Sequence, residues 1–138
     1  MGKTHHPRTI GRSVGAVFGG VAAGSILSFG SDVGLHAIGA FPPIGLWTAP
    51  DFLVGTAYRG VYMMVGCYFA AWLAPNRPMR HALFGGGVAL VLSLVGALTT
   101  WDNGLGPHWY PLALAALAMP CAWVGGRLHT VRTTRVVA

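Results

Sequence analysis

The stretch AYRGVYMMVGCYFAAWLAPNRPMRH, residues 57–81, decides how the chain is arranged. It starts inside an apolar helix that contains Arg59, passes through the short turn 75–80, and ends where another apolar helix begins. Pro75 does not continue a helix well, and Arg77 and Arg80 mark the cytoplasmic face of a membrane. Because the turn is so short, we expect the two helices to be antiparallel neighbours.

The composition extends this interpretation to the whole chain. Of its 138 residues, 54% are hydrophobic and 9% are charged, whereas a soluble domain carries about 25% charged residues. The net charge of +6 comes from cations in short segments between apolar runs, a pattern typical of membrane orientation and not of a basic nucleic-acid surface. We therefore expect the lipid bilayer as a partner, and no nucleic acid.

Four apolar runs, each about long enough to cross a hydrocarbon core of ~30 Å, predict an all-α fold. They cover residues 13–31, 52–74, 81–100 and 112–128, with polar tails at 1–12 and 129–138. The first run, with its basic start, could also be a signal peptide cleaved near Ala37, but it is longer than the usual apolar region and continues into Asp32. The prediction is one membrane domain, residues 1–138, folded as an up-down bundle of four transmembrane helices.

Charge and tryptophan positions orient the bundle. Eight of the nine lysines and arginines lie in the two termini and the 75–80 turn, while the three acids, Asp32, Asp51 and Asp102, lie on the opposite side. All five tryptophans fall at predicted span ends, as expected for aromatic belts. These positions predict a multi-pass protein of the bacterial inner (plasma) membrane, with both termini cytoplasmic.

Arg59 is the one basic residue that this topology leaves within the membrane. Asp32, at the outer end of the first span, lies at a similar depth, and Tyr62 shares a helix face with Arg59 by spacing. An Asp32–Arg59 ion pair is therefore predicted. It is either part of a site for an anion or a head group, or a structural pair that locks two helices; the second is favoured because one arginine alone defines no chemistry.

The two outer loops carry a further polar group, formed by His36, His108 and Asp102. These side-chain types could converge on a metal, but their spacings match no metal motif, so a single hydrogen bond for each histidine is favoured. No histidines lie at membrane depth for haem, and no nucleophile motif is found. We expect no metal, no cofactor and no catalytic residues.

Glycine patterns predict close helix packing. Gly11, Gly15 and Gly19 recur every four residues in the first span, as do Gly20 and Gly24, and such rows allow helix backbones to approach in lipid. The segment 18–21, FGGV, also resembles 84–88, FGGGV, in the third span. A duplicated hairpin and a chance match between glycine-rich segments both remain open.

The sequence is compared with three classes of function: an accessory subunit, a transporter and an enzyme. A non-enzymatic accessory, scaffold or assembly subunit is favoured, docking on other membrane helices in a homo-oligomer or a larger complex. The alternative is a small oligomeric transporter or channel-like protein for a small or anionic solute. Small multidrug transporters have this size but depend on an embedded glutamate, and this chain contains none. An enzyme is not expected, because the histidines and acids are scattered.

Three stretches carry a resemblance to a known group. They are SDVGLHAIGAFPP (31–43), AYRGVYMMVGCYFAAWLAPNRPMRHA (57–82) and GPHWYPLALAALAMPCAWVGGRL (106–128). In these stretches the chain resembles small four-span bacterial inner-membrane proteins that have no known activity. The resemblance implies the four-span architecture and nothing about mechanism. It draws attention to Asp32, His36, Arg59, His81, His108 and Trp109.

Overall fold

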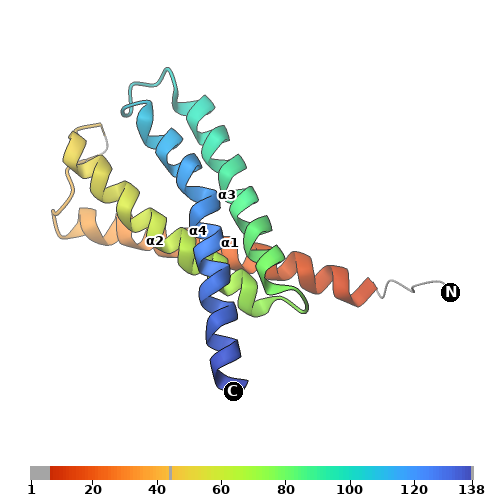
Figure 1. Ribbon diagram of the computed structural model, residues 1–138. Helices are drawn as coiled ribbons and strands as arrows, with labels where there is room; N and C mark the ends of the chain where they lie inside the picture. The colour runs from red at the N-terminus through yellow and green to blue at the C-terminus, as the bar shows by residue number, and fades with distance from the viewer. Residues whose placement is uncertain (1–6, 44, 138) are drawn as a thin grey trace.

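A computed structural model describes residues 7–43 and 45–137, and in this part of the chain the only regular elements are four helices. They are α1 (Pro7–Ala37), α2 (Ala49–Leu73), α3 (Pro78–Thr100) and α4 (Trp109–Val137) (Figure 1). The all-α prediction is confirmed. Three helices are long and apolar enough to cross a membrane, over Ile10–Ala37, Pro78–Thr100 and Trp109–Arg135.

The fourth helix, α2, is long enough to span, but it contains no stretch of span length as apolar as those of the other three. Its 25 residues include Asp51, Arg59 and the tyrosines Tyr58, Tyr62 and Tyr68. The sequence analysis counted residues 52–74 as a span because they form an apolar run about long enough to cross the membrane. Three of these residues, Tyr58, Arg59 and Tyr62, bond to side chains of α1. Asp51 bonds to Thr48 instead, and Tyr68 packs against His129 of α4.

Helices α1 and α4 extend well beyond the apolar runs that predicted them. Helix α1 begins six residues before the expected span and ends six residues after it, and α4 continues through most of the polar segment that follows residue 128. Thr130, Thr133 and Thr134 support this extension, since their hydroxyls donate to backbone carbonyls one turn earlier. Hydropathy predicts only the apolar part of a helix. The helix itself continues for as long as its backbone hydrogen bonds continue, so it can be longer than its apolar run.

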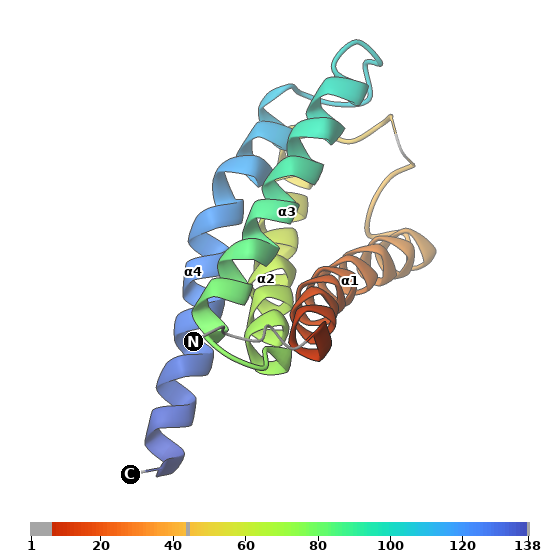
Figure 2. The same cartoon turned by 90° about the vertical axis from the view of Figure 1, so that its right-hand side faces the viewer.

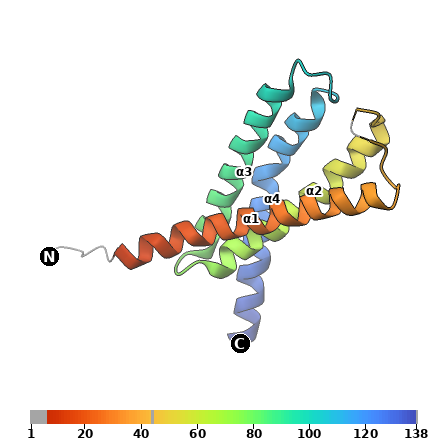
Figure 3. The ribbon, with the colours of Figure 1, turned by 180° about the vertical axis from the view of Figure 1, so that it is seen from behind.

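Helix α2 is the centre of the arrangement. It packs against each of the other three helices, while α1 contacts α2 and α3 and makes no contact with α4 in the described residues. Helices α3 and α4 run side by side as a hairpin, and α1 passes across this hairpin at a steep angle (Figures 1 and 2). Viewed from behind, α1 lies over α2 and the lower part of the hairpin (Figure 3). The bundle is therefore splayed, and not a set of four parallel rods.

Small residues form the helix contacts. A Cβ atom on Gly20 would lie 2.4 Å from the carbonyl oxygen of Gly66, and one on Gly86 would lie 2.4 Å from Ala122 Cβ. The fully buried positions are alanines, and among the described residues no large side chain is fully buried. Such contacts stabilise helices in lipid because backbones and short side chains approach closely enough for dispersion attraction.

The glycine row predicted on α1 is only partly used in these contacts. Gly19, Gly20 and Gly24 face α2, whereas Gly11 and Gly15 have no atom within 4 Å of an added Cβ. Large apolar side chains point outward instead, including Phe18, Ile26 and Leu98, each at least 65% exposed. This inversion, small inside and large outside, is expected for a helical protein that is solvated by lipid chains.

Candidate functional site

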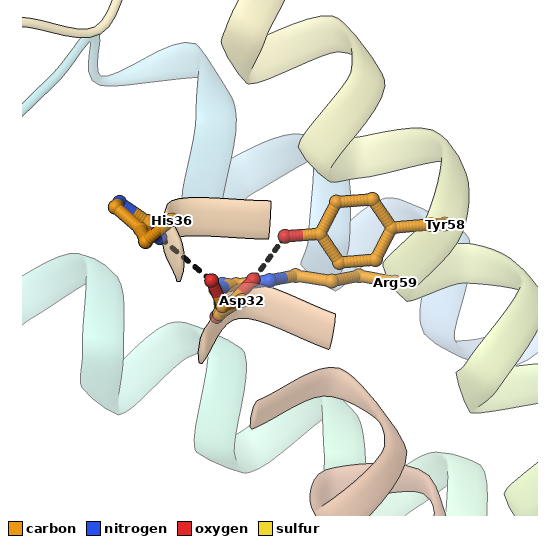
Figure 4. Close-up of polar contacts among 4 residues, drawn as sticks. All are labelled: Asp32, His36, Tyr58 and Arg59. Carbon is orange, nitrogen blue, oxygen red and sulfur yellow. Dashed lines mark hydrogen bonds and ion pairs between the residues drawn. The ribbon is translucent and has the colours of Figure 1, made fainter. Parts of the chain in front are cut away.

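An ion pair joins α1 to α2. Asp32 lies in the second-last turn of α1 and Arg59 in the middle of α2, and the antiparallel course of the two helices brings them together (Figure 4). Arg59 Nη2 donates to Asp32 Oδ2 over 2.5 Å. The predicted pair is therefore present, and its side chains are only 28% and 16% exposed for Arg59 and Asp32.

Tyr58 completes the coordination of the carboxylate. Its hydroxyl donates to Asp32 Oδ1, so both carboxylate oxygens accept a hydrogen bond from α2 (Figure 4). Tyr62, the predicted partner, lies one turn along and bonds instead to Ser31 Oγ over 2.7 Å. The sequence analysis assigned no role to Tyr58. The signal was its four-residue spacing from Tyr62, which puts the two rings on one face, 5.9 Å apart.

The other predicted polar residues do not form one cluster. His36 Nδ1 lies 2.7 Å from the backbone oxygen of Asp32, one turn earlier in α1. His108 Nε2 lies 2.9 Å from the backbone oxygen of Trp101, and its ring stacks on that indole with centroids 4.3 Å apart. Each histidine thus makes the single hydrogen bond that was favoured. No hydrogen bond or ion pair joins either histidine to Asp102, and the described residues contain no metal-binding group.

An aromatic cluster that the sequence analysis did not predict lies beside the ion pair. Its members follow one another with ring centroids 4.9–5.2 Å apart, from Phe41 to Trp47, then Phe52, then Tyr110. The cluster links the loop between α1 and α2 to α2 itself and to α4. Arg59 reaches this cluster, with its guanidinium carbon 5.7 Å from the centroid of the Tyr110 ring. The crowding of aromatics in the outer segments was the available signal, but their contacts depend on the tertiary fold.

A cleft of about 200 Å³ opens beside the ion pair. Residues of α1, α2 and α3 form most of its wall, with one leucine from α4. Asp32 and Arg59 line it together with Ser25, Ser28 and Ser93, and the remaining wall is glycine, alanine, cysteine and larger apolar side chains. The cleft exists because α1 crosses the α3–α4 hairpin instead of lying along it.

This arrangement can bind and orient a molecule, because it combines an apolar wall with a few convergent polar groups. The carboxylate of Asp32 is held by two donors, and Cys67, the thiol in the wall, is a buried free cysteine. A scan against models of known protein families, a search of curated proteins and a search of solved structures found no match for this chain.

Proposed function

We propose that the protein crosses the bacterial inner membrane four times, with both termini in the cytoplasm and α2 as the fourth span. Arg59 is the main cost of placing α2 in lipid, and its pairing with Asp32 reduces that cost because the two charges balance. The distribution of the other cations, in the two terminal segments and in residues 75–80, supports the orientation.

Within that membrane, the protein acts as a non-enzymatic accessory, scaffold or assembly subunit. The observation that carries this proposal is the engagement of Asp32, whose two carboxylate oxygens are both held by donors from α2. A carboxylate fixed in this way connects two helices, whereas a proton-coupled carrier needs an embedded acid that exchanges partners during transport. Helix α1, which contacts only α2 and α3, presents an exposed face that includes Phe18, Ile26 and Val33 to lipid or to a partner helix.

The second candidate is a small oligomeric transporter or channel-like protein for a small or anionic solute. The cleft favours it, since Arg59 and three serines line a space within the membrane-embedded part of the chain. One chain encloses little of this space, so transport would require a symmetric oligomer.

The membrane placement is tested by topology reporters. Fusions after residue 76 and at the C-terminus should be active as cytoplasmic reporters, and a fusion after residue 103 should be active as an external reporter. Cytoplasmic activity after residue 103 would contradict the four-span placement.

The accessory role is tested by purification from native membranes in mild detergent, followed by a mass-spectrometric inventory and a visible absorption spectrum. We expect a partner at fixed stoichiometry. It should be lost from a Phe18→Ala, Ile26→Ala variant and kept by a matched Val91→Ala, Leu98→Ala variant on the exposed face of α3. A colourless homo-oligomer that conducts an anion in liposomes, and that loses this flux in Arg59→Ala, would favour the transporter instead.

A further inference from the structure

The cleft beside the ion pair holds hydrogen-bonding groups that the fold does not use. Arg59 lines the cleft and makes one bond, from Nη2 to Asp32, although a guanidinium carries five N–H donors. Its side chain is 28% exposed, so part of it stays accessible from the cleft. A ligand with an acceptor oxygen could take the remaining donor capacity.

The serines of the cleft point to the same conclusion. Ser25, Ser28 and Ser93 line it, and no hydrogen bond joins their hydroxyls to another described group. The helical threonines of α2, α3 and α4 behave differently: each donates to a carbonyl three or four residues earlier, as Thr56 does to Phe52 and Thr100 does to Gly96. A half-buried hydroxyl that faces an apolar space without a partner is unfavourable, so Ser28 and Ser93, with the exposed Ser25 near them, indicate a polar ligand.

The charge balance determines what kind of polar group fits. The carboxylate of Asp32 balances the charge of Arg59. Each of its two oxygens already accepts one hydrogen bond, Oδ2 from Arg59 and Oδ1 from Tyr58. An anionic head group would compete with Asp32 and bring an unbalanced charge into the membrane, whereas a neutral oxygen acceptor disturbs neither. The rest of the wall, including Val21, Phe29 and Leu92, suits a hydrocarbon chain.

We infer that this cleft binds a neutral single-chain amphiphile, whose hydroxyl and carbonyl oxygens meet Arg59 and the serines and whose chain lies along the apolar wall. The inference rests on the membrane placement proposed above and not on the accessory role. The topology reporters test that placement separately, so the failure of one can be told from the failure of the other.

The test uses the full chain purified in mild detergent, with monoolein as the probe and with oleate and octadecene as probes of matched chain length. Native mass spectrometry counts bound molecules, and a thermal unfolding scan measures stabilisation. Monoolein should bind at one per chain and raise the unfolding midpoint, more than either of the other probes. Preference for oleate that depends on the cleft would overturn the inference in favour of an anion site, and equal binding of octadecene would leave only an apolar groove.

Two variants locate the binding. Ser28→Ala, Ser93→Ala should weaken monoolein binding about tenfold through lost hydrogen bonds, while Ser13→Ala, outside the cleft, should not. Ala89→Phe should fill the cleft and abolish binding, while Val91→Phe on the exposed face of α3 should leave it intact. The unliganded midpoint of each variant reports whether it is folded. Unchanged monoolein binding in folded Ala89→Phe, or absence of saturable binding in the wild type, would overturn the inference.

Discussion

The two hairpins of this protein use the same kind of glycine contact but differ in what else holds them together. In α3–α4, Gly86 lies against Ala118 and Ala122, and no polar side-chain bond joins these helices in the described residues. In α1–α2, Gly20 makes an equally close approach to Gly66, and beyond that point polar groups provide the connection. Close steric packing alone therefore joins α3 to α4, whereas α1 is held to α2 by glycine contacts and polar bonds together, and the cleft opens where α1 crosses the α3–α4 hairpin.

The two similar segments of the sequence, FGGV and FGGGV, supply these two glycine contacts. Gly20 in FGGV and Gly86 in FGGGV occupy the same place in their motifs, and each makes the tightest glycine contact of its own hairpin. Duplication of a hairpin stays a hypothesis. What the two segments share in physical terms is a glycine where two helix backbones cross.

The largest effect is expected from removing one charge of the α1–α2 pair. Arg59→Met leaves the carboxylate of Asp32 without a counter-charge, which should lower the free energy of unfolding by about 3–5 kcal/mol. The double variant Asp32→Leu, Arg59→Met removes both charges and should recover most of this loss. Unfolding by dodecyl sulfate in mild detergent measures both, and equal losses in the single and double variants would show that charge balance is not the cause.

A smaller effect is expected from overpacking the glycine contacts. Gly86→Val should cost about 2–3 kcal/mol, since the added atoms meet Ala122 Cβ and the Ala118 backbone oxygen in a compact hairpin. Gly20→Val should cost less, about 1–2 kcal/mol, because α1 has no contact with α4 and can shift outward. Gly87→Ala, with open space around it, is the matched control and should be neutral or slightly stabilising. A larger loss in Gly20→Val than in Gly86→Val would reverse the comparison.

Removing single tyrosine hydroxyls from α2 should show that a hydrogen bond to a charged group contributes more to stability than one between neutral groups. Tyr58→Phe deletes the donor to Asp32 and should cost about 1 kcal/mol, while Tyr62→Phe deletes a neutral bond to Ser31 and should cost about 0.5 kcal/mol. The same dodecyl sulfate titration measures both. Indistinguishable losses would indicate that the charge on Asp32 does not strengthen its bond with Tyr58.

The smallest effect concerns the start of α2. The hydroxyl and the backbone N–H of Thr48 both donate to Asp51 Oδ2, and these bonds, the hydroxyl first, lower the pKa of Asp51 from its ordinary value of 3.8. Because the folded pKa is lowered, the stabilisation is present above the ordinary pKa and disappears as the pH falls through the folded value. Thr48→Ala should therefore lower the unfolding midpoint slightly at neutral pH and flatten its acid dependence. An acid dependence in Thr48→Ala equal to that of the wild type would contradict this origin.

The local features of the fold could be predicted because they follow from side-chain chemistry along the chain. Apolar runs predicted the helices, Pro75 and two arginines predicted the α2–α3 turn, and opposite charges at equal depth predicted the Asp32–Arg59 contact. Each of these predictions needs only a residue's own preference for lipid, water or a counter-charge.

The tilt of α1 was decided by the tertiary structure alone, and with it the cleft, the role of Tyr58 and the aromatic cluster around Trp47. A helix in water shows its packing face through an apolar stripe, but a helix in lipid is apolar all round. The sequence of α1 therefore determined that it forms a long apolar helix with glycines suited to close contact. Which of those glycines meet α2, and at what angle, depends on the fit of both helix surfaces, because in lipid backbone approach and not hydrophobicity selects the contact.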